Sequence, residues 1–416
     1  MYKIILPDFS ILFSTKEQLV LTKNSTFSSV KIGSEMAENY NFDDIRPYYD
    51  HEAQKVLVEM SKDPLFLKLT NYFWPEMTKE EALKKVDLVN TVHDFQEHFM
   101  DSAIRTIVKR SSTGLSYSGF ENLNPNESYL FIANHRDILL DSAILQILLF
   151  QHGHDTSEIT FGNNLMEEGF ITHFGRLNRM FTVQREGTAR ELYDISKKLS
   201  AYIRHTITEK KVSVWIAQRN GRTKDGNDQT QTGLLKMLNI SGNGNFNESF
   251  KALKIVPLTI SYEYEPCDAL KVQELYLSSL HTKYKKAPGE DLNSIITGIV
   301  QPKGRIHMAV GKPISSELDG INKLENENEK IKQLTAFIDK QIYTDFKLWP
   351  VNYIAMDILE GNSNFTNEYT TEEKDNFIKY INDTISKLDG EKEPLFNLFI
   401  KMYAAPVKNK VLQTAY

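Results

Sequence analysis

The sequence feature that most constrains the fold is an alternation of short apolar segments with helical patterns between residues 129 and 310. Apolar or β-branched runs, which we expect to form strands, occupy residues 129–133, 159–161, 180–183, 212–217, 255–262 and 306–310. Helical patterns lie between several of them, and residues 188–209 place apolar side chains at helical spacing on one face. The alternation predicts an α/β fold, with a mostly parallel central sheet that is covered by helices.

The segments on either side of this region have helical patterns. Residues 43–108 repeat apolar side chains at helical spacing, and the pattern returns from about residue 315. A turn-forming stretch, NLNPNES at 122–128, separates the first helical segment from the alternating one. We therefore predict a helical N-terminal region (1–112), an α/β domain (113–315) and a helical C-terminal region (316–416).

Composition and charge restrict the class of protein. A net charge of −6 argues against a nucleic-acid protein, whose affinity depends on a basic face. The single cysteine, Cys267, excludes an internal disulfide and fits a reducing compartment. No segment approaches the roughly 20 apolar residues of a membrane-spanning helix, and the N-terminus lacks the pattern of a signal peptide. We expect a cytoplasmic protein that would meet a lipid substrate from the membrane surface.

The most informative stretch for chemistry is YLFIANHRDILLDSAILQILLF, residues 129–150. An apolar strand is followed by a polar turn that carries His135, and a helix is expected to begin near Asp141, which suits its N-cap. Catalytic groups of open α/β sheets lie at the carboxyl ends of strands. His135 could accept the proton of an attacking hydroxyl, with a carboxylate holding its tautomer. Asp141 and Asp137 are both candidates for that carboxylate, and a histidine that only stabilises the turn is the alternative.

This stretch resembles the first motif of the glycerol-phosphate acyltransferase superfamily, which includes glycerol-3-phosphate and 1-acylglycerol-3-phosphate acyltransferases. The motif of that family is His, four residues, Asp, whereas five residues separate His135 from Asp141. Aligning the start of the helix keeps Asp141 as the partner and places one extra residue in the turn. Asp137 remains the competing partner.

Three further segments resemble motifs of this family in the expected order. FTVQREG (181–187) is similar to the second and supplies Arg185, SVWIAQRNGRTKDG (213–226) is similar to the third, and KIVPLTISYEY (254–264) is similar to the fourth. The third lacks the glutamate of the family, because Arg219, Asn220, Gly221 and Arg222 occupy its place. GRIHMAVGKPI (304–314) is similar to a strand and turn near the end of such domains, so the resemblance covers residues 115–315.

The resemblance implies an O-acyltransferase that moves a fatty acyl group from acyl-CoA or acyl-carrier protein to glycerol-3-phosphate or its 1-acyl derivative. It implies no cofactor, no metal and no covalent enzyme intermediate. Guanidinium groups bind phosphate through paired hydrogen bonds, so the expected phosphate-binding residues are Arg185, Arg219, Gly221, Arg222 and Lys224. The alternative for this loop is a solvated basic surface.

Other functions remain open from the sequence. The acceptor could be another lipid hydroxyl, the chain could be a His–Asp hydrolase of thioesters or phosphoesters, or it could be a non-catalytic lipid-binding relative. A metal site in QHGHD (151–155) is disfavoured because further ligands are missing. The lysines at 283, 285 and 286 are interpreted as a solvated loop.

Overall fold

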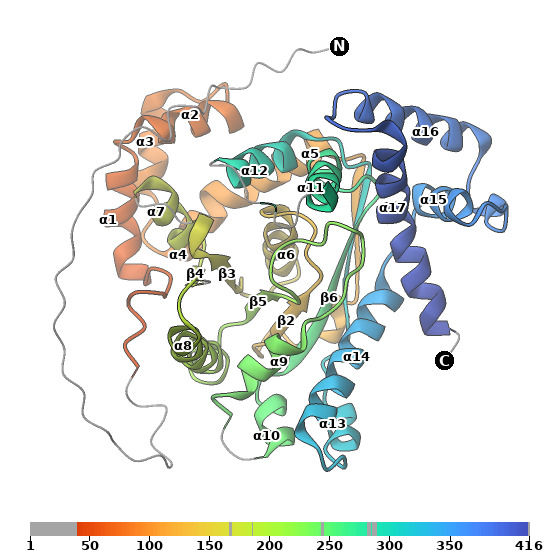
Figure 1. Cartoon of the computed structure of the whole chain (residues 1–416). Helices are drawn as coiled ribbons and strands as arrows, with labels where there is room; N and C mark the ends of the chain where they lie inside the picture. The colour runs from red at the N-terminus through yellow and green to blue at the C-terminus, as the bar shows by residue number, and fades with distance from the viewer. Residues whose placement is uncertain are drawn as a thin grey trace.

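A seven-stranded sheet forms the centre of the structure, which is a computed structural model that describes residues 40–165, 169–184, 186–242, 245–280, 284 and 289–414 (Figure 1). Its strands stand in the order β1-β7-β6-β2-β5-β3-β4. Neighbouring strands are parallel except β6 and β7, which are antiparallel, so β1 and β7 run opposite to the other five. The strands are β1 (Gly114–Ser118), β2 (Leu130–Ala133), β3 (Glu158–Gly162), β4 (Met180–Val183), β5 (Val214–Ala217), β6 (Ile255–Tyr262) and β7 (Arg305–Val310).

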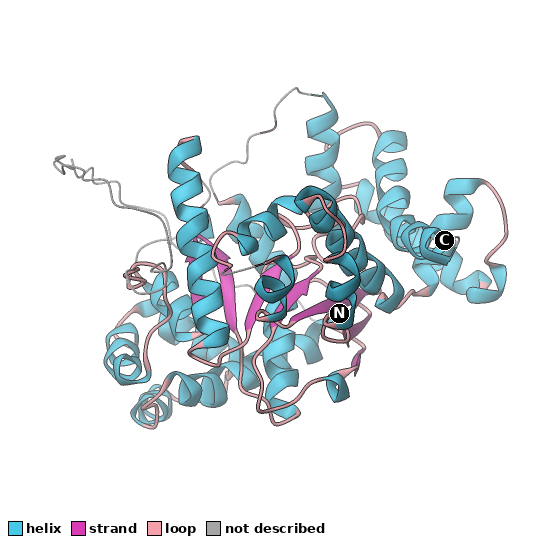
Figure 2. Ribbon diagram, turned by 90° about the horizontal axis from the view of Figure 1, so that it is seen from below, coloured by secondary structure: helices cyan, strands magenta, loops and turns pink. Residues whose placement is uncertain are grey.

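Helices cover both faces of the sheet, as the view in Figure 2 shows. On one face, α5 (Ser102–Ser111) and α6 (Leu140–Gln151) share an apolar core with the strands. On the other face, the strands pack against α8 (Ala189–Thr208), α9 (Thr232–Asn239), α10 (Phe246–Lys251), α13 (Ser316–Ile321) and α14 (Glu327–Asp345). Every residue of β2 and β6 is buried, because both strands are central and covered on both sides.

The local signals that start these helices are visible in the sequence. The hydroxyl of Thr188 caps α8 by accepting the backbone N–H of Glu191, and the carboxylate of Glu191 accepts the backbone N–H of Thr188. Before its last residue, Gln151, helix α6 has only Asp141 and Gln146 as strongly polar residues, which suits its place between α5 and the sheet.

Two helical groups flank the sheet on opposite sides in Figure 1. The N-terminal group consists of α1 (Asp50–Met60), α2 (Pro64–Phe73), α3 (Lys79–Asp87), α4 (Val92–Phe95) and a π-helix (Gln96–Asp101), together with α7 (Phe170–Leu177). The C-terminal group consists of α15 (Pro350–Glu360), α16 (Thr371–Ile385) and α17 (Lys392–Thr414), packed with α11 (Asp268–Leu280). Helix α12 (Glu290–Val300) lies beside α5. The division at residues 112 and 315 stays a prediction, and α14 from the C-terminal side packs on β6.

The expected α/β class with a mostly parallel sheet and helical flanks is confirmed. The predicted strands at 180–183 and 255–262 have the observed bounds, and the other four differ by one or two residues at their ends. Strand β1 was not predicted, because the polar sequence GLSYS has no apolar run.

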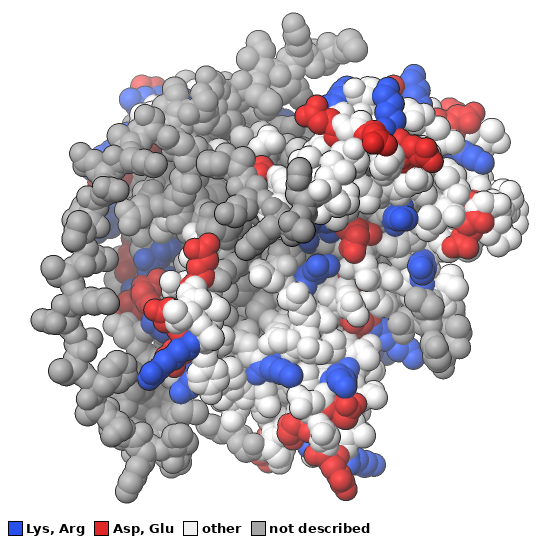
Figure 3. Space-filling model, in the orientation of Figure 1, with Lys and Arg blue, Asp and Glu red and all other residues white. Residues whose placement is uncertain are grey.

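Charged side chains of both signs are interspersed over the described part of the face in Figure 3. Among the helices that the structure describes, none has the length and apolar character needed to cross a bilayer.

Candidate active site

His135 lies directly after β2, at the edge of the sheet where the five parallel strands end. Its Nδ1 is 2.9 Å from the Oδ2 atom of Asp141 in the first turn of α6. The histidine side chain is 13% exposed and the aspartate side chain 1%, so only the imidazole can reach a substrate. The ring stands edge-on to Trp215 of β5, with 5.6 Å between the ring centres. The geometry is that of a histidine held by a buried carboxylate.

The carboxylate of Asp141 is surrounded by hydrogen-bond donors. Oδ2 also accepts the backbone N–H groups of Arg136 at 2.6 Å and Asp137 at 2.9 Å, and Oδ1 accepts the hydroxyl of Tyr262 at 2.8 Å. Burial, together with the charge of Asp141, raises the pKa of Tyr262, so this hydroxyl stays protonated and remains a donor. These donors compensate the buried negative charge, which therefore stays available to His135.

Asp137 has a different role in the structure. Its Oδ1 accepts the backbone N–H groups of Leu139 at 2.9 Å and Leu140 at 2.8 Å, which begin α6. The sequence-based assignment of Asp141 as the N-cap is therefore wrong, because the chain enters the helix earlier and Asp137 supplies the capping oxygen. The other oxygen of Asp137 is buried with no hydrogen-bond partner among the described residues. The structure thus pairs Asp141, rather than Asp137, with the imidazole.

The loop after β5 packs against the turn that carries His135. The backbone N–H of Thr223 donates to the carbonyl of His135 at 2.8 Å. Buried Asp228 joins the two segments, since its carboxylate accepts hydrogen bonds from Asn134 at 3.0 Å, Thr223 at 2.9 Å and the guanidinium of Arg136 at 2.5 Å. The loop with the predicted phosphate-binding residues is therefore fixed beside the histidine.

The predicted basic residues of this loop differ in how far their hydrogen-bond donors are already paired within the protein. Lys224 forms an ion pair with Glu274 of α11. Arg219 reaches only the carbonyl of Asn227 at 3.4 Å, and its Nε has no partner among the described residues. Arg222 likewise has an Nη1 atom that is buried without a partner in the described part of the chain. Arg219 and Arg222 are therefore the side chains of the loop with unused donors.

The glycines of this loop serve the backbone. Gly221 has φ +75° and Gly226 has φ +77°, a region that favours glycine. A Cβ at Gly221 would meet no other atom within 4 Å, whereas one at Gly226 would overlap the backbone carbonyl of Met402 in α17. Gly226 thus allows the C-terminal helix to pack on the loop. Arg185, the remaining predicted phosphate-binding residue, lies outside the described residues.

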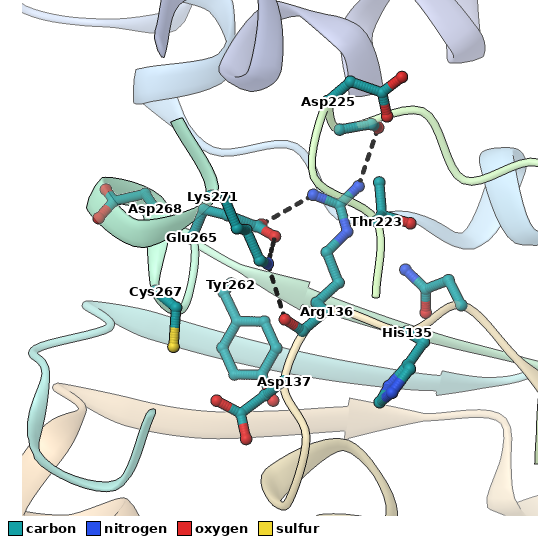
Figure 4. Close-up of polar contacts among 12 residues, drawn as sticks. His135, Arg136, Asp137, Thr223, Asp225, Tyr262, Glu265, Cys267, Asp268 and Lys271 are labelled. Carbon is teal, nitrogen blue, oxygen red and sulfur yellow. Dashed lines mark hydrogen bonds and ion pairs between the residues drawn. The ribbon is translucent and has the colours of Figure 1, made fainter. Parts of the chain in front are cut away.

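A buried cluster of charged side chains stands behind the histidine turn (Figure 4). The guanidinium of Arg136 lies between the carboxylates of Asp228 and Glu265, and the ammonium of Lys271 binds Glu265 at 2.6 Å. Burial opposes the charge on Arg136, but the two carboxylates outweigh burial and raise its pKa. The cluster contains two cations and two anions, which makes its burial possible.

Cys267 lies next to this cluster on the chain that follows β6. The thiol is fully buried, and burial, with the nearby charge of Asp137, raises its pKa to about 11. A thiol with such a pKa stays protonated near neutral pH and is a poor nucleophile. Cys267 is thus a packing residue of the site.

An apolar pocket with a volume of about 50 Å³ lies on the α5–α6 side of the sheet. Its wall includes Leu139 from the turn between His135 and Asp141, and Ala143 from α6. Apolar side chains from the π-helix, α5, α6, α7 and β4 complete it: Met100, Ile104, Ile147, Phe174 and Met180. The pocket therefore borders the histidine turn at Leu139.

No three His, Cys, Asp or Glu side chains are grouped as metal ligands in the part of the chain that the structure describes. In QHGHD, the ring of His152 stacks on Phe120 with 4.4 Å between the ring centres, and His154 is buried. Burial, with the nearby His152, lowers the pKa of His154. The segment is a structural turn at the end of α6.

Four residues that bear on the site were not predicted from the sequence: Asp228, Tyr262, Glu265 and Lys271. Asp228 stands in the loop after β5, two positions beyond the third motif. Tyr262 is separated from Asp141 by 121 positions, and no periodicity links the two. Its place at the end of a strand was the one available signal for Tyr262.

Comparison with known proteins gives two results. Residues 114–261 match the family model described as Acyltransferase, and this segment includes the histidine, its carboxylate and the loop after β5. A crystal structure titled as the 1-acyl-sn-glycerophosphate (LPA) acyltransferase PlsC from Thermotoga maritima is similar at 12% identity and a TM-score of 0.34, and the match covers 70% of this chain and 91% of that chain. No curated protein matches the sequence.

Proposed function

We propose that the protein is a lipid O-acyltransferase of the glycerol-phosphate acyltransferase superfamily, because residues 114–261 match the family model described as Acyltransferase. It transfers a fatty acyl group from acyl-CoA or acyl-carrier protein to a hydroxyl of glycerol-3-phosphate or 1-acylglycerol-3-phosphate. The observation that carries the proposal is the 2.9 Å contact between His135 Nδ1 and buried Asp141, beside a loop with unused arginine donors.

The reaction follows from the groups in the site. The acceptor hydroxyl attacks the thioester carbonyl carbon while its proton passes to Nε2 of His135. Asp141 holds the proton on Nδ1 and stabilises the imidazolium that forms. When the carbon–sulfur bond breaks, the thiolate leaves and takes the proton from Nε2, which returns His135 to its neutral form. A thioester is already activated, so the sequence of steps needs no covalent enzyme intermediate.

The acceptor phosphate is proposed to bind Arg222 and Arg219 in the loop after β5, with the backbone at Gly221 close by. Both side chains have buried nitrogen atoms without partners among the described residues, and guanidinium groups suit phosphate oxygens. Lys224 is proposed to contribute less, because its charge is compensated by Glu274. Arg185, which lies outside the described residues, remains a proposed fourth contact.

The acyl chain of the donor is proposed to enter the apolar pocket between α5 and α6. The pocket is lined by Leu139, which stands in the turn between the histidine and its carboxylate. The proposal requires the chain to leave the pocket at Leu139, so that its carbonyl carbon lies toward the imidazole. The protein is proposed to act in the cytoplasm at the membrane surface, where acceptor lipids are found.

The test is a transfer assay with the purified full chain. Thiol release and lipid product are measured with acyl-CoA or acyl-carrier protein, and with glycerol-3-phosphate, 1-acylglycerol-3-phosphate or a phosphate-free hydroxy lipid as acceptor. His135→Ala is expected to lower turnover by about 10³-fold or more without changing the thermal transition. His205→Ala is the matched control, since His205 also contacts a carboxylate, Glu209, at 2.9 Å but lies on the surface of α8.

The outcomes separate the alternatives. Product that forms only with a phosphate-bearing acceptor supports the proposal, and product with the phosphate-free acceptor alone assigns another lipid hydroxyl. Thiol release that does not depend on an acceptor would identify a hydrolase. Lipid binding without turnover, unaffected by His135→Ala, would identify a non-catalytic relative.

A further inference from the structure

Lys271 in the first turn of α11 is one of the most deeply buried charged residues, with 1% of its surface exposed. A lysine ammonium is costly to bury unless it has charged or polar partners. Its partners are the Oε1 atom of Glu265 at 2.6 Å and the backbone carbonyl oxygen of Arg136 at 2.7 Å. Figure 4 shows both contacts and also His135, which directly precedes Arg136 in the same turn.

The carbonyl that Lys271 binds belongs to the peptide between Arg136 and Asp137. The N–H of that same peptide, on Asp137, donates to Oδ2 of Asp141 at 2.9 Å. Oδ2 is also the atom that contacts the imidazole. The ammonium and the carboxylate of the His135–Asp141 pair are therefore linked through a single peptide group.

Such a link has a physical effect beyond packing. Hydrogen bonds in a chain polarise one another, so an ammonium on the carbonyl makes the N–H a stronger donor. The stronger donor fixes the carboxylate oxygen and stabilises its charge. It also fixes the plane of the peptide and hence the start of the turn that carries the imidazole.

Other titratable groups face this chain of contacts from the surrounding elements. Glu265 also binds Nη1 of Arg136 at 2.8 Å, so it joins the two cations. The others are Asp137 in the turn, Asp228 in the loop after β5, Tyr262 at the end of β6, Asp268 in α11 and Lys303 before β7. Asp268 receives hydrogen bonds from Tyr380 and Tyr403. Lys271 is the only one of these groups with a hydrogen bond to the carbonyl of Arg136 in the described part of the chain.

We propose that Lys271 is a positioning residue for acyl transfer, which acts through the Arg136–Asp137 peptide on the carboxylate of Asp141 and thereby on His135. The proposal rests on the proposed function, because it takes His135 as the proton acceptor. Arg136 is the first of the five residues between the histidine and the aspartate, so a cation from another element binds the backbone of this longer turn.

The experiment uses the full chain and compares Lys271→Met, Lys271→Gln and Lys271→Arg. Lys330→Met is the matched control, because Lys330 of α14 is also buried and pairs with Glu327, yet contacts none of these groups. Turnover and KM are measured for the acceptor that the wild type uses, from pH 5 to pH 9, and folding is followed by thermal unfolding.

Lys271→Met is expected to lower kcat by about tenfold or more while KM changes by less than about twofold. The acid limb of the pH–rate profile should move to higher pH, because a lost cation leaves the charge of Asp141 to act more strongly on the imidazolium. Lys271→Gln keeps a neutral donor and should show the same direction of shift, so it carries the test if Lys271→Met does not fold. Lys271→Arg should restore most of kcat and the position of the limb.

An acid limb that stays in place in Lys271→Met or Lys271→Gln would overturn the proposal, as would a loss of kcat that only follows the loss of folded protein. Lys330→Met should lower the thermal transition without moving the limb. If the wild type shows no acyl transfer, or His135→Ala is as active as the wild type, it is the proposed function that fails, and this inference fails with it. If the wild type is active and the acid limb of the Lys271 variants stays at the wild-type pH, the inference about Lys271 is refuted and the proposed function is not.

Discussion

Replacing each of the two candidate carboxylates by its amide gives the sharpest test of the site. Asp141→Asn keeps the shape of the side chain and removes its charge. The amide oxygen can still accept hydrogen bonds from the two backbone N–H groups that Asp141 binds. The hydroxyl of Tyr262 can turn so that its oxygen accepts a hydrogen bond from the amide NH2 group. We therefore expect the variant to fold.

The expected loss of activity follows from the hydrogen bond between Asp141 and His135. A hydrogen bond to a charged group contributes roughly 1.5–3 kcal/mol, and about 1.36 kcal/mol corresponds to a tenfold change in rate. Loss of the charge on Asp141 should therefore lower kcat by about 10- to 150-fold, and by more if the imidazole adopts the wrong tautomer.

Asp137→Asn should behave differently, because the structure gives Asp137 the capping role at the start of α6. Asparagine caps helices about as well as aspartate. We expect kcat to change by less than about threefold and the free energy of unfolding by less than about 1 kcal/mol. Steady-state kinetics with saturating acyl donor, together with thermal unfolding, measures both quantities. Equal losses of kcat in the two variants would refute the assignment of Asp141 as the partner of His135.

Four further variants test other parts of the structure. Arg222→Ala should raise the KM for a phosphate-bearing acceptor by about tenfold with little change in kcat. Lys224→Ala should raise the same KM by less than about threefold, because Lys224 is already paired with Glu274. Steady-state kinetics in which Lys224→Ala has the larger effect would contradict this order. Ala143→Phe should fill the apolar pocket and raise the KM of long-chain donors relative to short-chain ones, and an unchanged chain-length profile would remove the pocket from the donor site. Burial, with the nearby charge of Lys347, lowers the pKa of His307 to about 4, below its usual value near 6.5, so the folded state loses stability as the pH falls through this window. His307→Asn should therefore reduce the stability lost between pH 7 and pH 5 by roughly 2 kcal/mol in chemical unfolding, and an unchanged loss would show that His307 is not the cause.

The part of the site that could be predicted from the sequence is the part that is local in the chain. A buried strand, a polar turn and an apolar helix place His135 and Asp141 within one turn of each other, and the structure has them in contact. The choice between Asp137 and Asp141 could not be made, because both can reach the imidazole until the first residue of α6 is known. That boundary depends on which carboxylate caps the helix.

The contacts that support the pair could not be predicted, because they join distant segments. Lys271 meets Arg136 across 135 positions, and a lysine in the first turn of a helix normally faces solvent. The same limit applies to the sheet. An apolar run such as β7 predicts a strand but not its direction, and here β7 runs antiparallel to β6 after the two helices α11 and α12.

The close approach of α17 to Gly226 has a practical consequence for work with fragments. The carbonyl of Met402 occupies the space where any other residue at 226 would have its Cβ, and the hydroxyl of Tyr403 accepts the backbone N–H of Glu265. Helix α17 therefore packs directly against the segments that support the site, although Met402 comes about 175 positions after Gly226 in the sequence. A shortened version that ends at residue 315 would expose the ion cluster behind the histidine to water, so studies of activity should keep the C-terminus and place affinity tags elsewhere.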